Sequence, residues 1–206
     1  LGEEVPVIGF AGGPFTLAAY LVEGRGSRDH LAARAFMHAE PGAWNRLLTW
    51  CAKLSGEFLR LQVAGGARAV QLFDSWAGAL RRPDYITHAA PYSRLALEAV
   101  SVPRIHFGTG TGHLLESMAA CGCEAVGIDY LTPLDEAVRR LPGMVLQGNI
   151  DPAQLAAGWD SLESHTRDVV DRGRAAPAHV VNLGHGVPPR TDPAVLTDLV
   201  ALVHEL

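Results

Sequence analysis

The sequence predicts an α/β fold with a parallel sheet, in which short apolar strands alternate with amphipathic helices. Six apolar runs recur along the chain, each followed by glycine, proline or polar residues and then by a helical pattern. The runs are short, rich in β-branched residues and not strictly alternating, which is typical of strands covered on both faces. Strand–helix alternation repeated six times indicates a parallel sheet built from βα units.

The predicted strands follow these runs in order. The first, Val5–Phe10, belongs to a strand-like segment that begins at Glu3. The other five predicted strands are 67–73, 102–107, 124–128, 144–149 and 179–183.

The predicted helices lie between the strands. Apolar residues recur at three- and four-residue steps from Leu47 to Leu61, so one long helix is expected from Pro41 to about Gly65. A second helix is expected to begin at Pro83 and to run to about Val100. Further helix starts are expected where an oxygen-bearing N-cap residue precedes proline, as is typical of helix N-termini. These are Thr132-Pro133, Asp151-Pro152 and Asp192-Pro193.

Two architectures have this alternation, a doubly wound sheet and a (β/α)₈ TIM barrel. A doubly wound sheet requires a phosphate-binding glycine loop after its first strand, but Gly9–Pro14 is not GxGxxG, and Pro14 lacks an amide donor. A barrel instead places polar residues at the C-terminal ends of many strands. Such residues are present here, at Asp74-Ser75, Asp129-Tyr130, Asn149, Asp151 and His185. The barrel is therefore preferred.

The chain length then predicts an incomplete barrel within one domain, residues 1–206. Six units in 206 residues take about 34 residues each, and eight would need about 275, within the usual range for barrels. The chain has no low-complexity segment or linker. About two βα units are expected to precede Leu1, which is not a start methionine.

Composition excludes several classes of protein. The net charge of −5 argues against a nucleic-acid partner, since nucleic-acid binding requires a basic face. No apolar run approaches the ~18 residues of a membrane span, and no segment resembles a signal peptide. Three cysteines cannot form a disulfide scaffold and suit a reducing cytosol. Cys121 and Cys123 lack a partner cluster, so no metal site is expected.

Three side chains are candidate substrate-site residues because they follow predicted strands. Tyr20 lies on the helix after the first glycine-rich turn, where its phenol can donate a hydrogen bond into the barrel mouth or simply be half-buried. Ser75 is not part of a GxSxG elbow, so it suits hydrogen bonding to a carboxylate better than acyl chemistry. His185, between two glycines, is the best candidate by position.

Two other segments have both a structural and a functional interpretation, and Asp74 has a structural one. The loop Glu23–Ser27 is either a solvated surface loop or a mobile lid bearing Arg25. Phe107–His113, with three alternating glycines, is either a flexible barrel turn or a weak anion-binding signal. Asp74 is expected to cap the turn that follows its strand.

Several of these motifs together resemble uroporphyrinogen decarboxylases, in order and spacing and over essentially the whole chain. The matching stretches are Gly9–Tyr20, Glu23–Ser27, Gln71–Gly78, His106–His113, Val126–Tyr130, Leu146–Pro152, Asn182–Val187 and Thr191–Pro193. Arg25 and Tyr130 depart from the family pattern, which more often has Gly and Trp there.

The resemblance implies a cytoplasmic, homodimeric carboxy-lyase of heme and porphyrin biosynthesis. Such enzymes remove four acetate carboxylates from uroporphyrinogen III as CO₂, giving coproporphyrinogen III, without a metal or an organic cofactor. The resemblance assigns substrate-binding roles to Tyr20, Ser75 and His185, and no catalytic residue within this chain. The family's arginines and aspartate, which face the substrate carboxylates and pyrrole NH groups, are expected before Leu1. The 206 residues alone are therefore predicted to be inactive.

Two alternatives remain open at this stage. One is a zinc- or cobalamin-dependent methyltransferase on the same barrel, which would require a His and Cys pattern near the last strands; no cysteine follows Cys123. The other is a non-catalytic truncated remnant acting as a binding or structural module.

Overall fold

The computed structural model describes residues 5–206 of the chain, which form two compact units. One unit extends through Val126, and the other comprises Gly127–Leu206. Glu3 and Glu4, included in the first predicted strand segment, lie outside the described residues.

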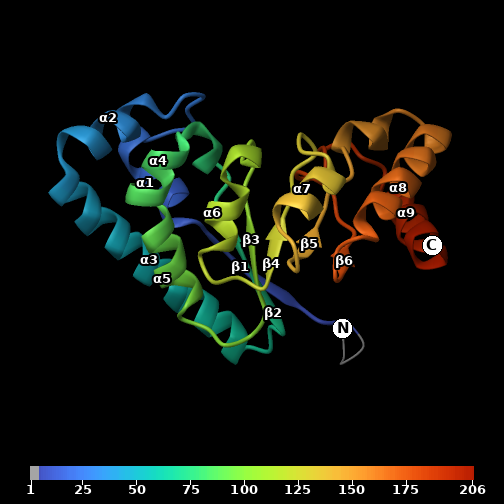
Figure 1. Cartoon of the computed structure of the whole chain (residues 1–206), viewed down its shortest axis with the longest axis horizontal. Helices are drawn as coiled ribbons and strands as arrows, with labels where there is room; N and C mark the ends of the chain where they lie inside the picture. The colour runs from blue at the N-terminus through green and yellow to red at the C-terminus, as the bar shows by residue number, and fades with distance from the viewer. Residues whose placement is uncertain (1–4) are drawn as a thin grey trace. The chain divides into compact units, whose positions relative to one another are not determined.

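Helices cover short strands in the first unit (Figure 1). Its strands are β1 (Ile8–Gly12), β2 (Ala69–Phe73), β3 (Arg104–Phe107) and β4 (Ala125–Gly127), the last of which reaches the unit boundary. Its α-helices are α1 (Pro14–Glu23), α2 (Leu31–Ala39), α3 (Pro41–Ala64), α4 (Arg82–His88), α5 (Ala90–Leu97) and α6 (Leu115–Ala119). Two 3₁₀ turns, η1 (Ala77–Ala79) and η2 (Gly112–Leu114), follow β2 and β3.

The second unit has the same alternation. It contains α7 (Leu134–Arg140), β5 (Val145–Gln147), η3 (Pro152–Ala156), α8 (Trp159–Gly173), β6 (His179–Val180) and α9 (Pro193–Glu205). Leu146 of β5 lies opposite His179 of β6 in a parallel pair. A single further bridge joins Ile150 to Leu183, so the predicted strand 179–183 is paired only at its two ends.

The strand order confirms the predicted parallel α/β sheet. It follows the sequence, β1-β2-β3-β4-β5-β6. In the first unit β1 is parallel to β2, with Ile8 opposite Ala69, and β2 is parallel to β3, with Val70 opposite Arg104. All carboxyl ends of such strands lie at one edge, which is where side chains of a barrel site gather.

The core of the first unit lies among its helices. α3 is the long helix predicted from the apolar periodicity, and its Trp44 and Leu48 are fully buried. They pack with Phe15 of α1, Met37 of α2 and Tyr85 of α4. This rigid cluster fixes the helix α1 that follows the first glycine-rich turn.

Two local predictions are wrong. The single helix expected over 83–100 is divided into α4 and α5 at Ala89, whose φ of −130° is not helical, because Pro91 restricts the first turn of a new helix. Thr132 does not cap α7; its hydroxyl donates to the Asp129 carboxylate at 3.4 Å, and Pro133 takes the N-cap position.

The two aspartate caps are confirmed. Asp151 Oδ1 accepts a hydrogen bond from the Ala153 amide at 2.9 Å, and Asp192 Oδ1 accepts one from the Ala194 amide at 3.0 Å. Each therefore satisfies one of the free amide donors at a helix start.

Candidate functional site

Tyr20 lies on α1 and stacks on the indole of Trp76, the residue after Ser75. The ring centroids are 3.8 Å apart with an interplanar angle of 27°, and 51% of Tyr20 remains exposed. His30 stacks on the same indole at 4.3 Å and 25°. The structure therefore brings Tyr20 close to the Ser75-Trp76 turn through ring contacts.

His30 is an unusual member of this stack. Its backbone is left-handed, with φ of 47°, a conformation that non-glycine residues rarely adopt. It is 3% exposed, and its Nδ1 has no hydrogen-bond partner among residues 5–206. Burial lowers the pKa of its imidazole, so the ring stacked on Trp76 is neutral at pH 7.

The loop Glu23–Ser27, expected to be either a surface loop or a lid, is hydrogen-bonded at one end to α2 and at the other to His30, the N-cap residue of α2. The Glu23 carboxylate accepts a hydrogen bond from the Ala33 amide at 3.1 Å, and Ser27 Oγ accepts one from the His30 amide at 3.1 Å. Gly24 takes the left-handed C-cap position after α1, with φ of 67°. Arg25, between these anchors, is exposed.

Ser75 is half-buried at the carboxyl end of β2 and is held by the loop after β3. Thr109 Oγ1 donates to the Ser75 carbonyl at 2.6 Å, while Thr111 Oγ1 donates to the Gly108 carbonyl at 2.9 Å. Both threonine hydroxyls of this glycine-rich loop thus donate to backbone carbonyls, which supports the barrel-turn interpretation of Phe107–His113. His113 Nε2 contacts the Leu80 carbonyl at 2.8 Å, which packs it against the neighbouring loop.

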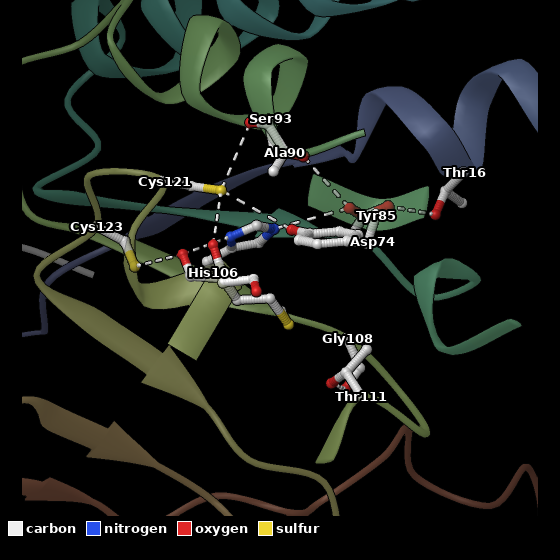
Figure 2. Close-up of polar contacts among 12 residues, drawn as sticks. Thr16, Asp74, Tyr85, Ala90, Ser93, His106, Gly108, Thr111, Cys121 and Cys123 are labelled. Carbon is white, nitrogen blue, oxygen red and sulfur yellow. Dashed lines mark hydrogen bonds and ion pairs between the residues drawn. The ribbon is translucent and has the colours of Figure 1, made fainter. Parts of the chain in front are cut away.

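Asp74 is the residue whose role the sequence reasoning missed. It was expected to cap a turn, but its side chain is 0% exposed and contacts three different elements (Figure 2). Its carboxylate accepts hydrogen bonds from Thr16 Oγ1 at 3.0 Å and Ser93 Oγ at 3.3 Å, and lies 3.8 Å from His106 Nε2. An aspartate directly after a strand, before the candidate Ser75, is the signal that could have indicated this.

His106 of β3 is also fully buried and pairs with Asp74. Its Nδ1 lies 3.3 Å from the Met118 carbonyl, which can only accept, so Nδ1 carries a proton. Burial lowers the pKa of His106, but the Asp74 carboxylate and the Cys121 thiol oppose it more strongly, and the pKa rises to about 9. The His106 ring, whose Nε2 lies 3.8 Å from the Asp74 side chain, is therefore an imidazolium at pH 7.

Two glycines make room for Asp74. A Cβ atom on Gly13 would lie 2.6 Å from the Asp74 Cγ, and a Cβ on Gly108 would lie 2.9 Å from the Asp74 carbonyl oxygen. Because real Cβ atoms do not approach so closely, the close approach of Asp74 explains the glycine at position 13, whereas at Gly108 the Thr111 Cγ2, 2.6 Å from an added Cβ, is a nearer obstacle than Asp74.

His185 lies in the second unit, in the exposed segment after β6. Its Nδ1 accepts a hydrogen bond from the Gly186 amide at 2.7 Å, which leaves Nε2 as the protonated nitrogen of the neutral ring. Nearby, Gly184 packs against Tyr130, where an added Cβ would lie 2.8 Å from the Tyr130 Cα. Tyr20 and Ser75 are brought together in the first unit, whereas His185 belongs to the other.

Other polar residues after the strands of the second unit make hydrogen bonds that connect neighbouring loops. The Asn149 amide donates to the carbonyls of Asp129 and Thr132 at 2.9 and 2.6 Å. His165 Nε2 accepts from the Asp151 amide at 3.0 Å. These contacts hold the loops after β4 and β5 together.

Cys121 and Cys123 are both buried. Cys121 Sγ donates to the Ser117 carbonyl at 3.3 Å, and burial raises the pKa of Cys123 to about 12. A thiol that stays protonated is a poor metal ligand. Within residues 5–206, no three His, Cys, Asp or Glu side chains lie close enough together to hold a metal ion. No described helix has the length and apolarity needed to cross a bilayer.

The fold and the polar strand ends define this chain as a member of the α/β-barrel class. The structure of a methyltransferase from Methanosarcina mazei superposes with a TM-score of 0.87 at 20% identity, covering 100% of this chain and 60% of that one. A B12-independent methionine synthase from Shewanella has a TM-score of 0.62 at 12% identity, covering 96% of this chain and 60% of that one. At such identities the likeness shows the fold alone.

Sequence comparison then gives the family. The family model described as "Uroporphyrinogen decarboxylase (URO-D)" matches residues 1–206, and the chain belongs to that family. A relative from Leifsonia xyli, named uroporphyrinogen decarboxylase, is 61% identical over 98% of this chain and 59% of its own length. A second relative, from Arthrobacter and also named uroporphyrinogen decarboxylase, is 58% identical. The match covers 98% of this chain and 60% of that protein's own length. The chain spans about 60% of these relatives, and the methyltransferase alternative is not favoured.

Proposed function

We propose that the protein carrying this chain is a uroporphyrinogen decarboxylase, which converts uroporphyrinogen III to coproporphyrinogen III. The observation that carries the proposal is the family match over residues 1–206, with relatives of that name at up to 61% identity. The reaction removes four acetate carboxylates as CO₂ in porphyrin biosynthesis. A cytoplasmic homodimer is the form that the family resemblance supports.

The chemistry requires little beyond electrostatics. Loss of CO₂ leaves an electron pair, which a protonated pyrrole ring accepts without a cofactor. The protein stabilises the positive ring and holds the remaining carboxylates by preorganised charges and hydrogen bonds. In this proposal the charged residues for that step come from the part of the relatives' length that this chain does not span.

Within this chain, we assign substrate binding and orientation to Tyr20, Ser75 and His185. Tyr20 is half-exposed yet fixed by stacking on Trp76, so its phenol is a preorganised donor. Ser75 offers a hydroxyl on a turn held by Thr109. His185 Nδ1 accepts a hydrogen bond from the Gly186 amide, so the ring carries its proton on Nε2. That N–H group can donate a hydrogen bond to a carboxylate.

The test is product formation from uroporphyrinogen under anaerobic conditions. The intact gene product should release CO₂ and yield coproporphyrinogen, whereas the 206 residues expressed alone should not exceed a control without protein. Stoichiometric tightly bound zinc with methyl transfer and no CO₂ release would overturn the proposal. Absence of any turnover by the intact product would favour a non-catalytic remnant.

A further inference from the structure

The cluster around Asp74 is connected by hydrogen bonds to the turn that bears Ser75. Thr16 Oγ1 donates to Asp74 Oδ1 at 3.0 Å and accepts from the Trp76 backbone amide at 3.2 Å. Because the amide can only donate, the hydroxyl proton is directed to the carboxylate. Carboxylate, hydroxyl and amide thus form one directed chain, and Figure 2 shows its first contact, between Thr16 and Asp74.

The end of this chain is the residue that holds Tyr20. The Trp76 indole stacks on Tyr20 at 3.8 Å and on His30 at 4.3 Å. The backbone amide of Trp76 is therefore held by Thr16, and the indole of Trp76 in turn stacks on the rings of Tyr20 and His30. The α1 helix contributes both Thr16 and Tyr20, one turn apart, so the same helix is joined to the turn at two points.

The charge of Asp74 gives this connection its strength. Hydrogen bonds to an ionised carboxylate are shorter and stronger than those between neutral groups. A buried carboxylate is costly unless it is paired. Asp74 Oδ2, the oxygen that Thr16 does not contact, accepts a hydrogen bond from Ser93 Oγ and lies 3.8 Å from His106 Nε2. Tyr85 and Cys121 also face this pair and are themselves buried.

We infer that Asp74 and Thr16 are positioning residues for the substrate site, because they fix the Ser75-Trp76 turn and the ring stack that includes Tyr20. Asp74 itself is fully buried, so its effect on the site is exerted through Thr16 and the turn. The inference rests on the proposed function only in that Tyr20 and Ser75 bind substrate there.

A general contribution of Thr16 to core stability is the competing explanation. Thr16→Val removes the hydroxyl at nearly constant volume, and Thr16→Ser restores it. The matched control is Thr166→Val on α8, which removes another buried threonine hydroxyl, one that donates to the Leu162 carbonyl at 2.8 Å in the other unit. These three variants are made in the intact gene product.

The first measurement is the near-ultraviolet circular dichroism of the Tyr20–Trp76 stack, isolated as the difference from a Trp76→Phe variant. The second is kcat and KM with uroporphyrinogen. Thr16→Val should lose most of the stack signal and reduce kcat/KM at least about tenfold. Thr16→Ser and Thr166→Val should keep both within about twofold.

Unchanged signal and kinetics in Thr16→Val would overturn the inference, and so would equal losses in Thr166→Val. If the unaltered protein shows no turnover, the proposed function fails, and the stack signal alone decides the positioning role. If Thr16→Val does not fold, hydrogen exchange of the Trp76 amide in the unaltered protein decides: protection supports the inference, and rapid exchange overturns it.

Discussion

At the scale of single residues, the buried pair of Asp74 and His106 gives the protein a pH-dependent stability. The pKa of His106 is raised to about 9, from an ordinary value of 6.5 in the unfolded chain. The folded state therefore binds more protons than the unfolded state between pH 6.5 and 9. The resulting stabilisation is present below pH 6.5 and is lost as pH rises through 9.

The free energy of unfolding should therefore fall by on the order of 3 kcal/mol between pH 6.5 and 9. His30, whose pKa is lowered by burial, should cause a separate loss below pH 6.5, where the unfolded chain gains a proton first. Urea unfolding across this range, with NMR titration of the His106 ring, provides the measurement. A flat profile above pH 6.5, or a His106 ring that titrates near 6.5, would contradict the assignment.

A second prediction concerns His185 and the proposed reaction. In the intact protein, His185→Ala should lower kcat/KM about 10- to 100-fold by removing one donor to a substrate carboxylate, without changing the unfolding midpoint. The matched control is His204→Ala on α9, an exposed histidine that should leave kinetics unchanged. Identical kinetics in both variants would remove His185 from the site.

At the scale of elements, the turn between β1 and α1 depends on a small residue at Gly13. Its φ of −62° suits any amino acid, so the only obstacle to a side chain is contact with Asp74. Gly13→Ala should therefore destabilise the fold by about 1–3 kcal/mol through overpacking. Gly26→Ala, whose Cβ would meet nothing within 4 Å, is the control. If denaturant unfolding shows equal stability for the two variants, the Asp74 side chain can shift away from an added Cβ at little cost in free energy.

The sequence predicted regular elements better than polar contacts. The apolar spacing of α3 and the proline-adjacent aspartate caps are local signals, and the structure confirms both. The helix break at Ala89 was missed although Pro91, which lies in the first turn of α5, is a local signal for it. The Asp74 cluster was missed because its partner Thr16 lies 58 residues away, a distance that no local pattern reports. The local signals were the glycine at position 13, whose Cβ would meet Asp74, and the aspartate directly after β2.

At the scale of the whole molecule, exposed apolar surface lies on two strands and on the long helix α3. β1 and β6 end the strand order, and Phe10 and Val180 on them are about half exposed. On α3 an exposed apolar stripe runs along one face; its members are Trp50, Leu54, Phe58 and Leu61. Unpaired strand edges and apolar patches of this kind favour association.

The 206 residues expressed alone should accordingly self-associate. Light scattering after size-exclusion chromatography should show species larger than a 22.0 kDa monomer, growing with protein concentration. Replacing Phe58 and Leu61 by lysine should reduce that growth. A monodisperse, cooperatively unfolding monomer of the unaltered chain would contradict this expectation.

We propose that this chain supplies part of the substrate site of a uroporphyrinogen decarboxylase. The most direct measurement is anaerobic incubation of the intact gene product with uroporphyrinogen III, quantifying CO₂ and coproporphyrinogen III, alongside a Tyr20→Phe variant. We predict four CO₂ released per coproporphyrinogen formed, and a lower kcat/KM when the Tyr20 phenol is removed. No CO₂ release by the intact product, or full activity in Tyr20→Phe, would contradict the account.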